Sequence, residues 1–87
     1  MDIRWSEKKN QRLIKMRGIG FRDLLDLGEI IYVDHNSVRP NQWLMLIWYD
    51  RYIWAIPFIH NENGLFLKTL YKSRKHTKKF LKGDYDG

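Results

Sequence analysis

The fold is decided by residues 43–59, WLMLIWYDRYIWAIPFI, which are two apolar runs joined by the dipeptide Asp50-Arg51. The first run, Trp43–Tyr49, is apolar on both alternating faces, which predicts a central strand covered on each side. Asp50-Arg51 predicts a short turn into a second strand, Tyr52–Ile59. Because Pro57 cannot donate a ladder hydrogen bond, this second strand should contain a bulge or a locally unpaired edge.

Further strands are predicted on either side of this pair. Ile30–Val33 is β-branched and aromatic, and residues 36–41, which include a proline, follow it as a loop. After the turn signal NENG at residues 61–64, the run Leu65–Tyr71 is the next strand. Consecutive strands joined by tight turns predict an antiparallel meander, to which a short strand at Ile3–Trp5 would add.

Two helices are predicted before these strands. Ser6 is a good N-cap, and the helix after it has one thinly apolar face at helical spacing, made of Asn10, Leu13, Ile14 and Arg17. Residues 18–20, Gly-Ile-Gly, end this helix. A second short helix follows and ends at a Gly28 C-cap.

One helix is predicted after the strands. Ser73 would cap it, and its inward stripe would consist of His76, Thr77, Phe80 and Leu81. The complete order predicts an α+β fold with two N-terminal helices, a four-stranded mainly antiparallel sheet, a possible extra N-terminal strand and a C-terminal helix. Residues 1–83 would form a single domain, and residues 84–87 a flexible tail.

Composition narrows the class of protein. A chain of 87 residues with 44% hydrophobic side chains predicts one compact domain. The sequence contains no cysteine, so neither a disulfide framework nor a thiolate zinc site is available. No apolar run reaches the roughly 18 residues of a membrane-spanning helix, and the N-terminus lacks the apolar region of a signal peptide. We therefore expect a cytoplasmic protein that does not use a membrane.

Charge is distributed in blocks along the chain, which has a net charge of +6. Residues 4–22 carry seven basic side chains against one acid, and residues 68–82 carry seven against none. Between them, residues 23–62 carry six acids against Arg39 and Arg51. Blocks of one sign attract nucleic acid or an acidic partner, although they can also be a plain solvated surface.

The start of the last helix breaks a local rule. Arg74 and Lys75 fall in its first turn and Lys72 precedes it, where the helix dipole favours acids. Cations together with free backbone N–H groups make a phosphate site, and local inconsistencies of this kind occur at functional positions. Lys68 and Tyr71 lie just upstream and could share the site. The alternative is a basic helix that only adds solubility.

Three histidines, His35, His60 and His76, are the side chains that titrate near neutral pH. His60 and Glu62 fall at a hairpin end, where they could act as base or acid, or be ordinary loop residues. Their spacing lacks further partners for a metal, so no metal site is expected.

The aromatic residues of the strands allow two interpretations. Trp43, Trp48, Trp54 and Phe58 could stack on single-stranded bases or form the core, and their apolar strands favour the core. No glycine-rich nucleotide-binding motif is present.

Two segments resemble those of a known toxin family. Residues 5–10 and 17–21, WSEKKN and RGIGF, resemble the opening of the BrnT-like toxins, W-D-x-x-K-N followed by H-G-[IV]-x-F. Residues 66–77, FLKTLYKSRKHT, resemble their C-terminal segment, R-x-I-S-A-R-x-A-T. The resemblance spans roughly residues 3–82. Three positions depart from the pattern, because Ser6 replaces an aspartate, Arg17 replaces a histidine and His76 replaces a small residue.

The resemblance implies a toxin of a type II toxin–antitoxin module, with a RelE-like fold that cleaves RNA without a metal or other cofactor. It also implies a cognate antitoxin, often a ribbon-helix-helix protein, through which the complex would contact operator DNA. Arg74 matches the arginine before the family's last helix, and Lys68 stands where many members carry arginine. The family's histidine at the position of Arg17 is a possible proton donor, and this chain lacks it there.

The sequence therefore predicts a metal-independent endoribonuclease. The residues predicted to take part in catalysis are Lys68, Tyr71, Arg74, His60 and Glu62. Those predicted to contact nucleic acid are Lys9, Arg17, Lys72, Lys75, Lys78 and Lys79. Two alternatives stay open: a non-catalytic RNA- or DNA-binding module, and an interaction protein whose basic faces dock an acidic partner.

Overall fold

The computed structural model describes residues 2–86 and consists of three helices and six strands. The helices are α1 (Glu7–Arg17), α2 (Phe21–Leu27) and α3 (Arg74–Leu81). The strands are β1 (Asp2–Trp5), β2 (Glu29–His35), β3 (Trp43–Tyr49), β4 (Tyr52–Asn61), β5 (Gly64–Leu67) and β6 (Tyr71–Lys72). The predicted α+β class, the two N-terminal helices and the C-terminal helix are confirmed.

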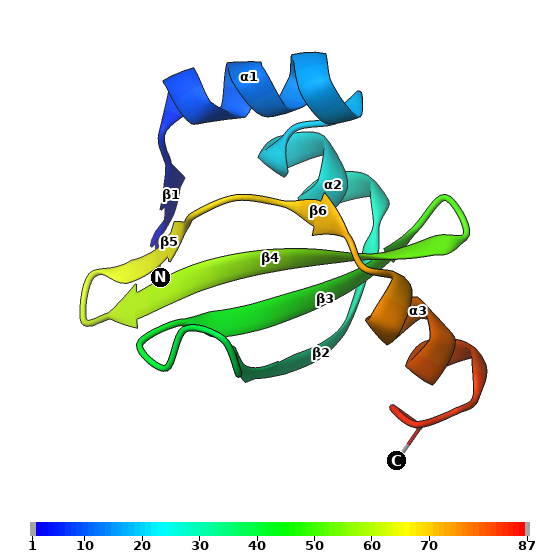
Figure 1. The fold of residues 1–87 in the computed structure, drawn as a ribbon. Coiled ribbons are helices and arrows are strands. Elements are labelled where there is room, and N and C mark those ends of the chain that lie inside the picture. Colours follow the sequence, from blue (N-terminus) through cyan, green and yellow to red (C-terminus); the bar gives the residue numbers. More distant parts are fainter. Residues whose placement is uncertain (1, 87) are drawn as a thin grey trace.

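All six strands belong to one sheet, in which five follow the order β1-β5-β4-β3-β2 (Figure 1). Neighbours from β2 to β5 are antiparallel, as the tight turns predict, whereas β1 lies parallel to β5. The β3–β4 turn is Asp50-Arg51, and both residues have positive φ angles of 51° and 61°, as the twist of a two-residue hairpin requires. β6 is a two-residue strand that pairs with β4 beside β5.

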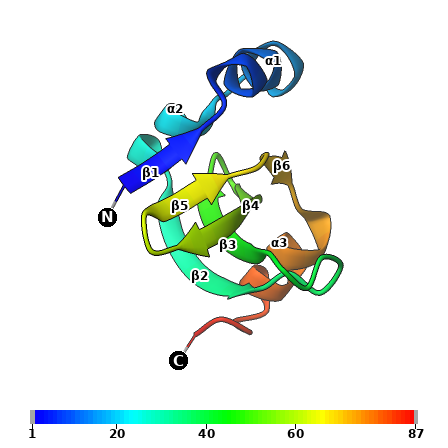
Figure 2. The ribbon, with the colours of Figure 1, turned by 90° about the vertical axis from the view of Figure 1, so that its left-hand side faces the viewer.

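The two faces of the sheet are covered by different helices (Figures 1 and 2). One face packs against α1 and α2, where Leu13, Phe21 and Leu24 meet Ile47, Ile56 and Leu67 of the sheet. The other face packs against α3, where Phe80 covers Leu44, Leu46, Ile53 and Ala55. Because β3 and β4 lie in the middle of the sheet, their side chains are buried on both faces, which is the reason for the continuous apolar runs.

A buried asparagine fixes α1 against α2. Asn10 accepts a hydrogen bond from the backbone N–H of Phe21 at 2.9 Å, and its own amide donates to Glu7 at 3.1 Å. A Cβ at Gly20 would lie 2.5 Å from Oδ1 of Asn10, so the close approach of the two helices requires glycine at that position. Ser6 caps α1 as predicted, since its hydroxyl accepts from the N–H of Lys9.

The structure differs from the sequence prediction in the number of strands. The predicted strand Leu65–Tyr71 is two strands, β5 and β6, separated by residues 68–70. The extra N-terminal strand is present as β1, so the sheet has six strands where four were expected. The reason for the division is that Leu67 and Leu70 are both fully buried, at 1% and 0% exposure, which a regular strand would place on opposite faces.

Two helix ends also differ from expectation. Gly28 follows α2 as predicted, but its φ of −89° is not left-handed; the position requires glycine because a Cβ would collide with the side chain of Ile47. In α3, Thr77 is buried as predicted, whereas Leu81 is 70% exposed because the helix ends there, beyond the sheet.

The sequence predicts a flexible tail at residues 84–87, of which residue 87 lies outside the described residues. Tyr85 lies against the α3-covered face, with its ring centroid 5.1 Å from that of Tyr32 and its hydroxyl 2.6 Å from Nδ1 of His76. Within residues 2–86, no helix has the length and apolar character needed to span a membrane.

Candidate functional site

The sheet is interrupted where β4 contains its proline. β4 pairs with β5 from Phe58 onward and with β6 at Trp54 and Ala55, and the backbone N–H of Lys68 donates to the carbonyl of Pro57 at 2.8 Å. The N–H and C=O of one strand residue point to the same side. The N–H that Pro57 lacks would therefore point toward the interruption. The hydrogen bonds between β4 and β3 are unaffected. The predicted unpaired edge is confirmed at this point.

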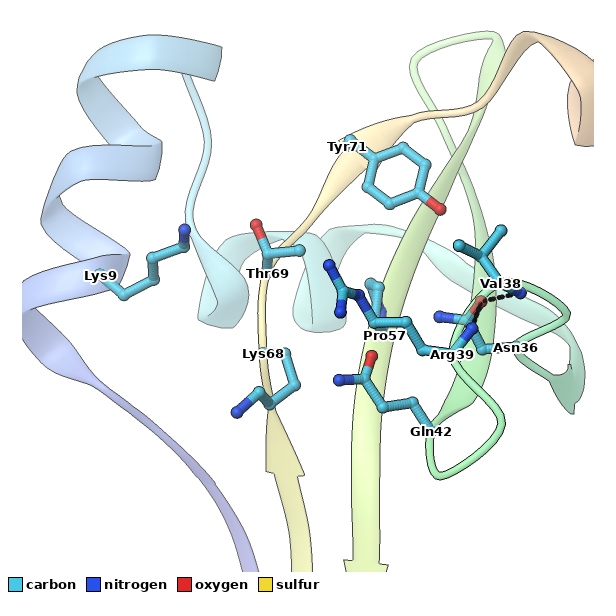
Figure 3. Close-up of a pocket in the computed structure, with 9 residues that line it drawn as sticks. All are labelled: Lys9, Asn36, Val38, Arg39, Gln42, Pro57, Lys68, Thr69 and Tyr71. Carbon is cyan, nitrogen blue, oxygen red and sulfur yellow. Dashed lines mark hydrogen bonds between the residues drawn. The ribbon is translucent and has the colours of Figure 1, made fainter.

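A groove of about 550 Å³ lies over this interruption (Figure 3). Besides β4, it is lined by α1, the loop between β2 and β3, the connection from β5 to β6, and the first residue of β6. The lining residues are Lys9, Asn36, Val38, Arg39, Gln42, Pro57, Lys68, Thr69 and Tyr71.

The loop from β2 to β3 is held in one conformation by its own hydrogen bonds. Oδ1 of Asn36 accepts from the backbone N–H groups of Val38 and Arg39, at 3.0 and 3.3 Å. The N–H of Gln42 donates to the carbonyl of Arg39 at 2.9 Å. The side chains of Arg39 and Gln42 consequently reach from the loop toward the β5–β6 connection (Figure 3).

The groove has a strongly positive lining. Lys9, Arg39 and Lys68 come from three separate segments, and no carboxylate or imidazole joins them among the groove's residues within positions 2–86. The hydroxyl of Tyr71 and the amides of Asn36 and Gln42 add hydrogen-bonding groups. Cations that converge on a polar groove can hold a phosphate, and the guanidinium of Arg39 can do so in a bidentate manner.

No family model, curated protein or solved structure matches this chain significantly.

The structure brings together three of the residues predicted from sequence, namely Lys9, Lys68 and Tyr71. Two more, Arg17 and Lys72, lie in a second pocket of about 300 Å³ with Met16 and Trp54. The remaining cations, Arg74, Lys75, Lys78 and Lys79, are exposed on α3 and do not line either pocket.

The predicted base and acid, His60 and Glu62, do not reach the groove. Tyr71 pairs with Ala55, and His60 is five residues further along β4, which corresponds to roughly 17 Å of strand. Glu62 lies beyond it, in the turn between β4 and β5. Even an uninterrupted strand 65–71 in the register His60–Leu65 would place Tyr71 beside Trp54, six residues from His60, so the pairing of β4 itself separates these residues.

His76 lies on α3, in contact with Tyr85. Burial lowers the pKa of His76, and the positive charges of Lys75 and Lys79 lower it further, whereas Asp34 opposes them. Burial is also the main cause that raises the pKa of Tyr85. This pair joins α3 to the last residues of the chain, away from the groove residues.

The aromatic residues of β3 and β4 belong to the core, as predicted. Trp54 and Phe58 are 3% and 5% exposed, and Trp43 and Trp48 are partly buried against the two clusters. They present no free stacking platform. In the part of the chain that the structure describes, no three His, Asp or Glu side chains gather as a metal site would require.

Sequence reasoning missed Asn36, Arg39 and Gln42. Arg39 is one of two basic residues in an otherwise acidic segment, so charge blocks do not single it out. The signal that could have revealed this loop is Asn36, because an asparagine side chain can accept a hydrogen bond from the backbone N–H two residues later, here that of Val38, and so form a local turn. Such a turn indicates an ordered loop, and ordered loops often carry function.

Proposed function

We propose that this protein is an RNA-cleaving toxin of a type II toxin–antitoxin module, of the BrnT-like kind with a RelE-like fold. The observation that carries the proposal is that Lys9, Arg39, Lys68 and Tyr71 line one groove. The α+β order of elements and the sequence resemblance at residues 5–21 and 66–77 add support. Basic charge in blocks at both ends of the chain favours a polyanionic substrate.

The proposed reaction is transesterification at one phosphate. The ribose 2′-OH attacks the adjacent phosphorus while the bond from phosphorus to the 5′ oxygen breaks, leaving a 2′,3′-cyclic phosphate and a 5′-OH. Arg39 and Lys68 neutralise charge that develops on the phosphoryl oxygens, and Lys9 holds a neighbouring part of the strand. Tyr71 gives its hydroxyl proton to the leaving 5′ oxygen and regains one from water. The proton of the 2′-OH passes to solvent.

The test is incubation of the purified chain with RNA in the presence of a metal chelator. Fragments that end in 2′,3′-cyclic phosphate are the expected product. Their rate of formation should rise with pH through neutrality, without the bell-shaped profile of a histidine pair, since the proton acceptor is solvent. RNA that stays intact but is bound would favour the non-catalytic nucleic-acid-binding alternative.

The proposal includes a protein partner, a small ribbon-helix-helix antitoxin that neutralises the toxin and carries any contact with operator DNA. Expression of the chain alone in a bacterium should arrest growth, and co-expression with the product of the adjacent gene should restore it. If growth continues in both cases, the toxin assignment is wrong. Restored growth with intact RNA throughout would instead support the third alternative, an interaction protein whose basic faces dock its partner.

A further inference from the structure

The groove and the second pocket lie at the two ends of one seam. Each takes a cation from α1 and another from the segment that follows β5: the groove takes Lys9 and Lys68, and the pocket takes Arg17 and Lys72. In Figure 1 the β5–β6 connection runs alongside α1, and Figure 2 shows it beneath the end of that helix. Two cation pairs therefore face each other across the same seam.

The spacing of the two pairs is similar on both sides of the seam. Lys9 and Arg17 are eight residues apart on α1, which is about 12 Å of helix. Lys68 and Lys72 lie opposite Pro57 and Trp54, which are three residues apart on β4, or about 10 Å. Between them, Leu13 on α1 and Leu70 in the connection are buried and close the floor of the seam.

The cation of Lys72 in the second pocket lies near two aromatic rings. Its Nζ is 5.4 Å from the ring centroids of both Tyr52 and Trp54. Attraction to the two rings favours this direction of the side chain, while the residue itself remains exposed. Arg17 stands beside it at the end of α1, with no acid among the pocket's lining residues in the described chain.

We propose that the seam between α1 and residues 68–72 is a track for single-stranded nucleic acid, with Arg17 and Lys72 as a second phosphate subsite. A stacked strand advances about 3.4 Å per nucleotide, so two subsites about 10–12 Å apart contact different phosphates of the same strand. This inference rests on the proposed function, because it takes RNA as the polyanion. It adds that the RNA must be long enough to reach both subsites.

The test compares two ligands that differ in length. Both are 2′-O-methyl RNA pools, which bind but cannot be cleaved through a 2′-OH: a dinucleotide with one phosphate, and a nonamer. Binding is followed by fluorescence anisotropy for the nonamer and by NMR titration for the dinucleotide, over a series of salt concentrations. Cleavage of ordinary RNA is measured separately, so that loss of activity and loss of binding are distinguished.

The variants are Arg17→Gln and Lys72→Gln, with Lys15→Gln as the matched control. Lys15 is an exposed cation on α1 that lines neither pocket. For the nonamer, each of the first two variants should lower the slope of log K against log salt by about 0.7, the value for one phosphate contact. Dinucleotide binding should stay unchanged, whereas Lys68→Gln should weaken both ligands.

Two results overturn the track. If Arg17→Gln and Lys72→Gln bind the nonamer as Lys15→Gln does, no second subsite exists, while cleavage by the wild type would leave the proposed function intact. If the wild type binds neither ligand, the track and the RNA assignment fail together. Length-dependent binding without cleavage would support the track and contradict the nuclease.

Discussion

Ile53 and Pro57 lie four residues apart on the same side of β4, and they differ in how their backbone polar groups are hydrogen-bonded. At Ile53 every backbone group is used: its carbonyl accepts from the N–H of Ser73 at 2.8 Å, and its N–H donates to the hydroxyl of Thr77 at 2.8 Å. That hydroxyl donates in turn to the carbonyl of Ser73 at 2.7 Å. At Pro57 the carbonyl accepts from Lys68, but no N–H is present, and the chain opens into a groove.

This difference implies that the Ile53 end of β4 contributes mainly to stability, whereas the Pro57 end borders the proposed site. The Ile53 end is buried and closed, so its hydrogen bonds anchor α3 to the sheet and leave nothing for a ligand. At the Pro57 end, β4 keeps its pairing with β3 but lacks an N–H toward the interruption, and cations line the groove beside it. Substitutions at the two ends should therefore affect different measurements.

The largest effect should come from the groove. In the proposed reaction Lys68 stabilises charge in the transition state, and removal of such a cation by Lys68→Ala should cost about 10²–10³-fold in rate. Because Lys68 is exposed, stability should change by less than about 0.5 kcal/mol. The measurement is the rate of RNA cleavage together with urea unfolding.

Two further variants sharpen that result. Arg74→Ala should cost less activity than Lys68→Ala, since Arg74 is exposed on α3 and does not line the groove. Lys15→Ala should cost least. Equal losses in all three variants would mean that overall charge, and not the groove, governs cleavage.

A substitution at Leu70, in the floor of the groove, should change the free energy of unfolding. Leu70 is fully buried between the exposed Lys68 and β6, and it holds the interruption against the core. Leu70→Ala should lower the free energy of unfolding by about 2–5 kcal/mol, as for other buried leucines. Urea denaturation measures this change. A loss under about 1 kcal/mol would mean that residues 68–70 are not fixed to the core.

A substitution at the Ile53 end of β4 should cause the next largest loss of stability. Thr77→Val keeps the shape of the side chain but leaves the buried N–H of Ile53 without a partner, which costs about 1–3 kcal/mol. For a domain of this size, each kcal/mol lowers Tm by about 4–8 °C. Cleavage at a temperature where the variant is folded should be unchanged. The matched control is Lys78→Ala, at the exposed neighbouring position.

The smallest effect concerns pH. The pKa of His76 is lower in the folded protein than its ordinary value of about 6.5, so the unfolded chain binds the proton more readily. The stability that this residue contributes is present above that value and is lost as pH falls below it. His76→Gln should flatten the dependence of Tm on pH between about 7 and 5. A steeper dependence in the variant would mean that folding raises the pKa of His76.

Much of the fold follows from patterns that a single chain segment carries. The continuous apolar runs of β3 and β4, the turn at Asp50-Arg51 and the caps at Ser6 and Ser73 each depend on neighbouring residues, and sequence predicts them. Pro57 also predicts the unpaired edge, because a missing N–H is a property of the residue itself.

The site was predicted less well, because it depends on which segments meet. Lys9 and Lys68 belong to basic blocks and were identified by charge, whereas Arg39 stands in an acidic segment and joins them through the ordered β2–β3 loop. His60 pairs with Leu65 next to the β4–β5 turn, whereas Tyr71 pairs with Ala55, so the two residues are separated along β4. Contacts between distant segments are not encoded in local periodicity.

The parallel pairing of β1 with β5 has a consequence for the order in which the molecule can be completed during synthesis. Asp2 pairs with Gly64, and a Cβ on Gly64 would collide with the carbonyl oxygen of Asp2. Contacts between residues so distant in sequence form slowly. Because β1 is synthesised before β5, it must wait for residues 64–67 before it can pair, and the groove must wait for Lys68 and Tyr71. A nascent chain therefore has no complete groove until Tyr71 has emerged.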